Sequence, residues 1–400
     1  MDYDLICVGG GLGGAGIAGA LAARGARVLV LERETRFRDR VRGEYLECWG
    51  VAEARALGLD GALAAAGAHA STFLETYIGP MRVTRRDFDD PADPRDPPRC
   101  FGHPTFQEAV LAHAAAAGAE VRRGAAVTEV VPGKPPAVRF RGESGASEAR
   151  TARLVVGADG RDSKLRRLPG FVESRDANRL CLAGVLLDGY AGPDDTSATF
   201  FDFAAAEEAL LFPQGKGRLR AYAAYRSDTG VRRLSGRERI PDFLRLFATT
   251  GVPADWLANV SPSGPLAAFE GADSSVAMPY RNGVALVGDA AATSDPVWGC
   301  GMSLTLRDVR VLRDALLATE DWEAAGRAYA EEHDRYYQRL HTLEDWMSTL
   351  FFTNTPEGDA RRARVFAKAL AEPDRLIDIV GRGPDQATDE ATRQRVFAED

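Results

Sequence analysis

Cysteine and lysine are both scarce in this chain of 400 residues, and each scarcity excludes a class of protein. The five cysteines form no Cys-x-x-Cys pair and are odd in number, which excludes a zinc ribbon or a redox-active dithiol and favours reduced thiols. Lysine occurs only four times, so arginine supplies nearly all of the positive charge. The formal net charge of −8 argues against a general nucleic-acid-binding surface.

Long uncharged apolar runs are also missing. The best candidate window is interrupted by Arg24 and Arg27, which excludes a membrane-spanning helix. Residues 1–4 lack the basic region of a signal peptide. We therefore expect a cytoplasmic protein without an integral membrane segment. Its length favours two intertwined domains with an ample core.

What the chain does contain is a strand, a glycine-rich turn, a helix and a second strand within its first 32 residues. Residues 3–8 are a short apolar run typical of a buried strand, and residues 15–24 predict a helix of small side chains. Residues 27–31 predict the second strand, and Glu32 follows it directly. This order is the context that a dinucleotide-binding turn requires, whereas the glycines alone would be weak evidence.

Each residue type in this turn has a physical role. Gly9 permits a tight turn, Gly11 lets the backbone approach a pyrophosphate, and Gly14 lets helix and strand pack closely. The helix N-terminus offers unpaired N–H groups to the phosphates. Glu32 can accept a ribose 2′-hydroxyl and would repel a 2′-phosphate, which favours FAD or NAD over NADP as the resident ligand. The intervening loop residues of the predicted site are Leu12 and Gly13.

Two further segments place an acid after a buried strand. Asp159 ends the apolar run at residues 152–158, and its alternative role is to cap a helix. Asp289 follows the run at residues 283–287, where a carboxylate can hold a ribityl or ribose hydroxyl. The bare backbone that follows would approach a ring system, with a helix N-terminus aimed at it. The residues predicted to do this are Pro296, Gly299, Gly301 and Met302.

These three motifs, in this order, resemble those of the single-component FAD-dependent monooxygenases of the p-hydroxybenzoate hydroxylase type (group A). They are the loop at 9–14, the Asp-Gly motif at 155–161 and the Gly-Asp motif from 288 to 301. The resemblance covers residues 1–330 and implies FAD as the cofactor. It also implies an arginine near the pyrophosphate, matched by Arg42, and a glutamine near the ribityl chain, matched by Gln107. Arg33 and Val127 complete the cofactor site that we predict.

The same resemblance implies the fold class. We expect an α/β protein in which a Rossmann-like FAD-binding domain of the glutathione-reductase type is interleaved with an antiparallel-sheet substrate domain, followed by C-terminal helices. Strand-like segments at 181–187, 197–203, 209–213 and 218–225 predict that sheet, and the acidic, proline-rich residues 88–98 predict an exposed loop. The predicted FAD-binding domain comprises residues 1–72, 99–180 and 271–330, the substrate domain comprises 73–98 and 181–270, and the helical region comprises 331–400.

The function implied is a monooxygenase that uses NADPH or NADH and molecular oxygen to hydroxylate or epoxidise an aromatic or polycyclic small molecule through a C4a-peroxyflavin. The cofactor supplies the difficult chemistry, so no catalytic side chain is assigned and no metal is expected. Phe201, Tyr222 and Trp298 are candidate pocket residues. Strand alternation leaves open which face of the sheet Phe201 and Tyr222 occupy, and Trp298 either covers the pocket or only fastens its loop.

Two other functions remain open at this point. One is a flavin-dependent reductase or dehydrogenase that acts without oxygen, and the other is a non-catalytic flavin-binding sensor. The sequence Trp-x-Trp-x-Ile-Pro of flavin halogenases does not occur, which argues against halogenation. The expected partners are a small organic substrate and oxygen, without nucleic acid, and the chain is expected to be a monomer or a homodimer.

Overall fold

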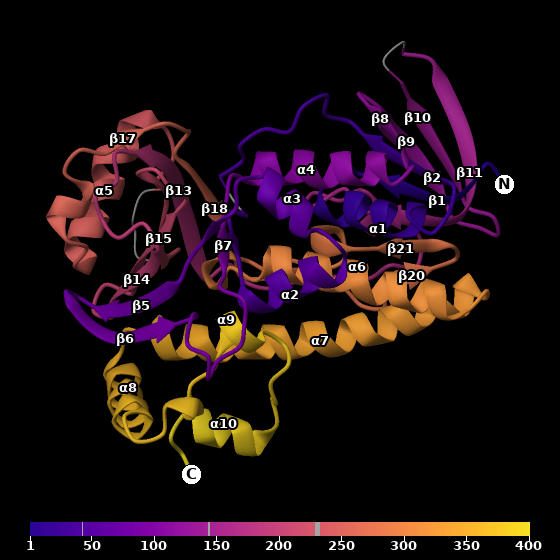
Figure 1. The fold of residues 1–400 in the computed structure, drawn as a ribbon. Helices are drawn as coiled ribbons and strands as arrows, with labels where there is room; N and C mark the ends of the chain where they lie inside the picture. Colours follow the sequence, from indigo (N-terminus) through magenta and orange to yellow (C-terminus); the bar gives the residue numbers. More distant parts are fainter. Residues whose placement is uncertain (42, 143–144, 229–232) are drawn as a thin grey trace.

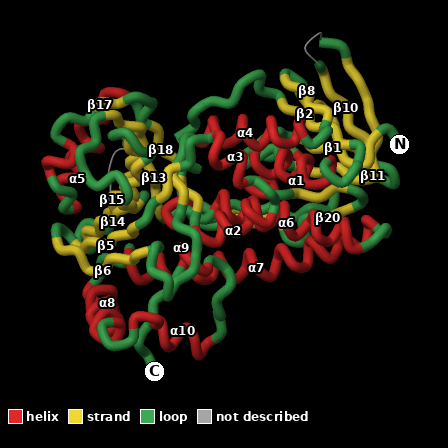
Figure 2. The backbone as a smooth tube through the Cα atoms, in the orientation of Figure 1, coloured by secondary structure: helices red, strands yellow, loops and turns green. Residues whose placement is uncertain are grey.

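Two large β-sheets, joined by helices, make up most of the molecule. A computed structural model describes residues 1–41, 43–142, 145–228 and 233–400. The two sheets lie at opposite ends of the view in Figure 1, with most of the helices between and beneath them. Figure 2 shows the same arrangement, with the strands of the two sheets and the helices coloured separately.

The first sheet has the order β20-β21-β11-β1-β2-β8, and its central strands run parallel. Strands β1 and β2 are apolar and almost wholly buried because helices or other strands cover both faces of the sheet. β9 and β10 extend this sheet as an antiparallel pair beside β11. The bounds are β1 Tyr3–Val8, β2 Val28–Glu32, β8 Glu120–Arg123, β9 Ala126–Val131, β10 Ala137–Arg141, β11 Ser147–Gly157, β20 Tyr280–Arg281 and β21 Val284–Leu286.

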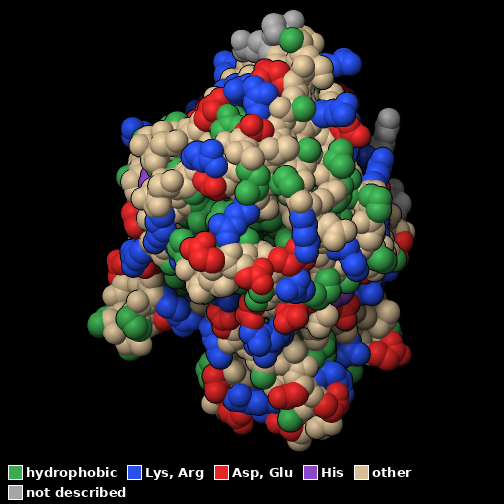
Figure 3. Space-filling view, turned by 90° about the vertical axis from the view of Figure 1, so that its right-hand side faces the viewer, with side chains coloured by type: hydrophobic (Ala, Val, Ile, Leu, Met, Phe, Trp, Pro, Cys, Tyr) green, Lys and Arg blue, Asp and Glu red, His purple; other side chains and the backbone are tan. Residues whose placement is uncertain are grey.

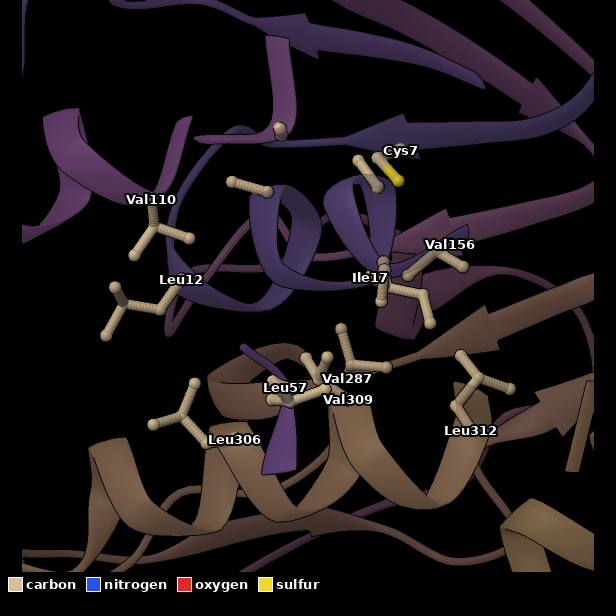
Figure 4. Close-up of a cluster of buried hydrophobic side chains, with 14 of the residues drawn as sticks. Cys7, Leu12, Ile17, Leu57, Val110, Val156, Val287, Leu306, Val309 and Leu312 are labelled. Carbon is tan, nitrogen blue, oxygen red and sulfur yellow. The ribbon is translucent and has the colours of Figure 1, made fainter. Parts of the chain in front are cut away.

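Three helices of this region share one core with the sheet. α1 (Leu12–Ala22) is buried along its whole length and packs against α4 (His103–Ala116) and α6 (Gly301–Ala318). Figure 4 shows Ile17 of α1 and Val309 of α6 pointing toward each other beside the end of the sheet. Small side chains along α1 permit this close approach, so the turn before the helix is held against a rigid support.

The second sheet has the order β17-β13-β16-β15-β14-β5-β6, with β18 also paired to β13. Its strands confirm the predicted positions within one or two residues, and helix α5 (Ile240–Thr250) packs on the outer side. The bounds are β5 Phe73–Ile78, β6 Met81–Asp87, β13 Leu180–Asp188, β14 Thr196–Asp202, β15 Glu207–Pro213, β16 Arg218–Arg226, β17 Ser261–Pro262 and β18 Ala267–Glu270.

Short elements join the two large sheets. A three-stranded sheet has the order β3-β7-β4, and β12 pairs with β19. The helices α2 and α3 follow the first of these strands along the chain. The bounds are β3 Tyr45–Leu46, α2 Cys48–Ala56, α3 Asp60–Ala65, β4 His69–Ala70, β7 Arg99–Cys100, β12 Glu173–Arg175 and β19 Ser274–Val276.

The C-terminal part is helical, as the sequence predicts. α7 (Trp322–Phe351) runs beneath both sheets in Figure 1, and α8 (Pro356–Ala369) lies under the second sheet. α9 (Ile379–Arg382) lies against α2, and α10 (Glu390–Val396) lies below α7. The mixed α/β architecture therefore confirms the expected fold class.

The proline-rich segment 88–98 is a loop with residues 89–92 exposed, as the sequence predicts. It is also tied down by ion pairs. Asp378, next to α9, accepts hydrogen bonds from Arg86 at 2.7 Å and from Arg95 at 2.6 Å, and Asp93 also pairs with both arginines. Charge-assisted bonds of this kind fix the loop against the C-terminal region.

The surface carries both signs of charge. On the face shown in Figure 3, Lys and Arg side chains alternate with Asp and Glu. None of the helices within the described ranges combines the length and the apolar character needed to cross a bilayer.

Candidate active site

One large cavity, of about 1720 Å³, runs from the glycine-rich turn to the second sheet and the C-terminal helices. The structure brings most of the predicted site residues together around it. The predicted residues that line the cavity are Gly9, Gly11, Leu12, Gly13, Glu32, Arg33, Gln107, Val127, Asp159, Phe201, Tyr222, Asp289, Pro296, Trp298, Gly299, Gly301 and Met302. Gly14 lies behind the turn, and Arg42 falls outside the described residues.

The turn before α1 has a shape that only glycine fits. Gly9 adopts φ +102°, and a β-carbon there would overlap the carbonyl oxygen of Ala158. A β-carbon on Gly14 would overlap the carbonyl oxygen of Gly9. Gly11 differs, because a β-carbon there would meet only Gln107 Nε2, at 3.4 Å. Gly9 and Gly14 thus serve the fold of the turn, whereas the free face of Gly11 borders the cavity.

The two charged features at this end of the cavity have opposite sign. α1 begins after Gly11 with no side chain capping it and no acid in its first turn, so its N–H groups and positive dipole end are available to an anion. Glu32 is buried, and its carboxylate accepts hydrogen bonds from the Gly10 N–H at 2.7 Å and the Glu34 N–H at 2.8 Å. Arg33 is largely exposed at the rim.

Of the two roles that the sequence left open for Asp159, the helix cap is not formed, because the short helix at Leu165–Arg167 has no side-chain cap, and the cofactor role stays a prediction. One oxygen, Oδ2, accepts a hydrogen bond from the Lys164 N–H at 2.8 Å and so closes the turn after β11. The other, Oδ1, is buried and has no hydrogen-bond partner among the described residues. An unpaired buried carboxylate oxygen at the cavity wall fits a ligand hydroxyl.

The Gly-Asp segment is held in place from two sides. The Arg166 guanidinium donates to the carbonyl oxygens of Asp289 and, at 2.9 Å, of Ala290. On the other side, the Gly288 N–H donates to Asp308 Oδ2 at 2.6 Å. Arg166 follows the Asp-Gly motif along the chain, so the second and third motifs are coupled directly. Sequence reasoning missed Arg166 because its partners are backbone atoms more than 120 residues away.

The far end of the cofactor region is a second bare stretch of backbone. Gly299 adopts φ +74°, and a β-carbon there would lie 2.9 Å from Glu47 Oε1. α6 begins at Gly301 without an acid in its first turn, so its positive end also borders the cavity. Glu47 Oε2 and Tyr45 Oη are buried without hydrogen-bond partners among the described residues.

These features together fit FAD. Two helix N-termini and two glycine segments border one cavity, and unpaired buried oxygens at Asp159 and Glu47 mark where ligand donors would be satisfied. The individual cofactor contacts stay predictions.

The second sheet forms the remaining wall. Phe201 and Tyr222 both face the cavity, which settles the strand alternation that the sequence left open. Trp298 lines the cavity and also fastens its loop, since its indole N–H donates to Ser348 Oγ at 3.0 Å. The Tyr222 hydroxyl donates to Glu44, a buried carboxylate that sequence reasoning did not single out. The motif at Arg42 and Gly43, which directly precede Glu44 in the chain, was the sequence signal that could have identified it.

A half-buried carboxyl, Asp295, begins the loop that carries Trp298, and a buried one, Glu344, lies behind it. Burial, the dominant cause, raises the pKa of Asp295 to about 7 and that of Glu344, on α7, to about 8. Glu344 accepts a hydrogen bond from the Ser294 hydroxyl at 2.9 Å. The nearby Cys300 is buried, and burial raises the pKa of its thiol, so this cysteine is an inert filler rather than a reactive thiol.

The C-terminal helices contribute apolar side chains to the cavity wall, and the sequence did not identify these residues individually. They come from α7, α8 and the segment around α9, and with the second sheet they line an apolar chamber beyond the backbone at 299–301. Representative members are Met347, Leu350, Phe351, Phe366, Leu376, Ile377 and Val380.

Comparison with known proteins agrees with this geometry. The FAD binding domain family matches residues 2–345. Digeranylgeranylglycerophospholipid reductase 1 of Methanopyrus kandleri is 27% identical over 85% of this chain and 87% of its own length. Rifampicin monooxygenase of Streptomyces venezuelae is 26% identical over 92% of this chain and 75% of its own length.

Solved structures share the fold. The structure of p-nitrophenol 4-monooxygenase from Pseudomonas putida DLL-E4 superposes with a TM-score of 0.78 at 18% identity, covering 99% of this chain and 97% of the other. Flavin-dependent brominase Bmp2 gives a TM-score of 0.76 at 16% identity, covering 99% and 98%. With the family match over residues 2–345, the chain belongs to the FAD binding domain family, of the group A flavoprotein monooxygenase type.

Proposed function

We propose that this protein is an FAD-dependent monooxygenase that uses NADPH or NADH and molecular oxygen to hydroxylate or epoxidise an aromatic or polycyclic small molecule. The observation that carries the proposal is the continuity of the cavity. One cavity joins a site built for a dinucleotide to an apolar chamber, so an organic substrate and the reactive end of FAD can meet away from water.

The chain's own residues would bind and orient the cofactor. Gly11 and the N-terminus of α1 would receive the pyrophosphate, Glu32 a ribose hydroxyl, and Asp289 and Gln107 the chain between phosphate and ring. Bound FAD would supply the redox chemistry with the nicotinamide donor and oxygen. The N-terminus of α6 would favour negative charge on the ring.

The chamber would position the substrate and exclude water. Its walls are aromatic and aliphatic, and the wall residues Phe201 and Phe351 pack against each other with ring centroids 4.7 Å apart. Such walls favour a flat or polycyclic apolar body. The named activities of rifampicin and squalene monooxygenases, both relatives of this chain, support a bulky substrate.

A reductase is the second candidate, and a specific observation favours it. Several relatives are digeranylgeranylglycerophospholipid reductases, which match most of this chain at 25–28% identity. An enzyme of that kind would reduce a carbon–carbon double bond without oxygen. A non-catalytic flavin sensor is the third candidate, and it would require FAD that NAD(P)H does not reduce.

Substrate-dependent oxygen consumption separates these functions. FAD-loaded protein is supplied with NADH or NADPH and a panel of aromatic and polycyclic compounds, and the masses of the products are measured by mass spectrometry. A monooxygenase adds one oxygen atom and consumes oxygen only with substrate. Addition of two hydrogens under anaerobic conditions would identify the reductase, and FAD that NAD(P)H cannot reduce would support the sensor.

We also propose that the protein is cytoplasmic and that it is a monomer or a homodimer. All five cysteines are free, which fits a reducing compartment such as the cytoplasm. Analytical ultracentrifugation of the FAD-loaded protein would test the expected monomer or homodimer.

A further inference from the structure

Glu208 is a carboxyl in an otherwise apolar part of the chamber wall. It lies on β15 with its side chain on the cavity side, the side shared by Leu210 and Phe212. Its partners in the neighbouring strands are Phe201 and Ala224, both buried apolar residues. Only 2% of Glu208 is exposed. The sheet therefore carries a buried acid on its apolar, cavity-facing side, near the start of β15.

This carboxyl lacks the partners that buried acids normally have. Its Oε2 atom receives no hydrogen bond from any described residue. Glu44 is a useful contrast, because that buried carboxylate receives the Tyr222 hydroxyl and pairs with Arg220 at 3.2 Å. Burying a polar group without a hydrogen bond is costly, so such a group is rarely kept for folding alone.

The surroundings also affect the protonation of the Glu208 carboxyl. Burial, and then the nearby acid Asp295, raise the pKa of Glu208 well above its ordinary value. Burial thus favours the neutral carboxylic acid form of Glu208, which can donate one hydrogen bond and accept others. A neutral acid in an apolar site suits a neutral hydroxyl or carbonyl better than a charged group.

The unpaired oxygens of Asp159 and Glu47 have a different explanation. Asp159 lies at the end of β11 beside the glycine-rich turn, and Glu47 lies against Gly299, so both face the cofactor region. Glu208 instead belongs to the second sheet, among the side chains of the substrate chamber.

We propose that Glu208 is the polar recognition residue of the substrate chamber, and that the substrate carries an apolar body with one neutral hydroxyl or carbonyl group that hydrogen-bonds to it. The inference rests on the proposed function, since it assumes that this chamber receives the organic substrate. It adds a requirement that apolar walls alone do not impose.

Paired probes test this requirement. Equilibrium dialysis of FAD-loaded protein against naphthalene and 2-naphthol compares two bicyclic compounds that differ by one hydroxyl. Purely apolar walls would favour naphthalene, because its transfer from water sacrifices no hydrogen bond. Wild-type protein is expected to bind 2-naphthol about tenfold more tightly than naphthalene, which corresponds to about 1.4 kcal/mol.

Three variants make the test specific. E208L is expected to lose the preference for 2-naphthol while still binding naphthalene, which shows that the chamber is intact. E208Q keeps a donor and an acceptor and is expected to retain most of the preference. The adjacent Glu207 is not part of the cavity wall, so E207L is the matched control and should behave as wild type.

Each remaining outcome overturns the proposal. A wild-type protein that prefers naphthalene, binds both probes equally or binds neither would do so, as would a preference that survives in E208L. These results are independent of flavin reduction and oxygen consumption. Failure of the Glu208 proposal can therefore be distinguished from failure of the monooxygenase proposal.

Discussion

Replacing Gly11 by alanine should separate cofactor binding from folding. The backbone of Gly11, at φ −68° and ψ −169°, is open to any residue, and an added β-carbon would meet only Gln107 Nε2, at 3.4 Å. Alanine is a poorer N-cap than glycine, but it also reduces the entropy of the unfolded chain, and each effect is worth roughly 0.5–1 kcal/mol. The two nearly cancel, so the stability of the apoprotein should change by less than about 0.5 kcal/mol.

The effect on FAD should be far larger. In the proposed site the pyrophosphate approaches the bare backbone at Gly11, and the added methyl group would displace it from the first N–H groups of α1. Losing two charge-assisted hydrogen bonds, at about 1.5–3 kcal/mol each, costs about 3 kcal/mol or more. That corresponds to at least a hundredfold weaker binding, since about 1.4 kcal/mol is tenfold.

The assay titrates FAD with apoprotein and follows the flavin fluorescence, while urea unfolding of the apoprotein reports stability. Gly14→Ala is the informative comparison, because its β-carbon would overlap the Gly9 carbonyl and should impair both folding and binding. A Gly11→Ala protein that binds FAD within twofold of wild type would refute this placement of the pyrophosphate. A large loss of apoprotein stability would refute the steric argument.

Three further substitutions test other parts of the structure. Glu344→Gln should reduce the decrease in the free energy of unfolding between about pH 5 and 8, because a buried acid whose pKa is raised to about 8 binds more protons in the folded than in the unfolded state and so destabilises the fold as pH rises through this window. Urea unfolding at several pH values measures this decrease, and the exposed Glu331→Gln should leave it unchanged. Asp378→Ala removes the hydrogen-bond acceptor of Arg86 and Arg95, so it should lower the free energy of unfolding by about 1–2 kcal/mol and speed proteolysis in segment 88–98. An unchanged cleavage rate would show that these ion pairs do not hold the loop. Glu32→Ala should weaken FAD binding about tenfold in the same fluorescence titration, and unaltered affinity would remove Glu32 from the site.

Local sequence predicted the elements that depend on neighbouring residues. The turn at 9–14 and the acid at the end of β2 lie within one short βαβ unit, where spacing alone fixes the geometry. The strands of the second sheet were also predictable, because their aromatic and aliphatic runs are bounded by turns. Cofactor contacts at these positions stay predictions, and Arg42 lies outside the described residues.

Features that depend on distant pairing could not be predicted. Which face Phe201 occupies is set by packing against the C-terminal helices, about 150 residues further on. The apolar segment around α9 has too few residues to show a helical period, so its place in the chamber wall was invisible. Glu208 gives no signal in the sequence, because an acid at a strand end normally faces water and only the sheet register shows that it is buried.

The first measurement is an anaerobic visible spectrum of the purified protein, taken before and after addition of NADH or NADPH and again after admission of air. A flavin spectrum that bleaches with the nicotinamide and returns in air is the expected result for an FAD-dependent, oxygen-using enzyme. A protein that is colourless and cannot be loaded with FAD would contradict the assignment of the cavity and the function built on it.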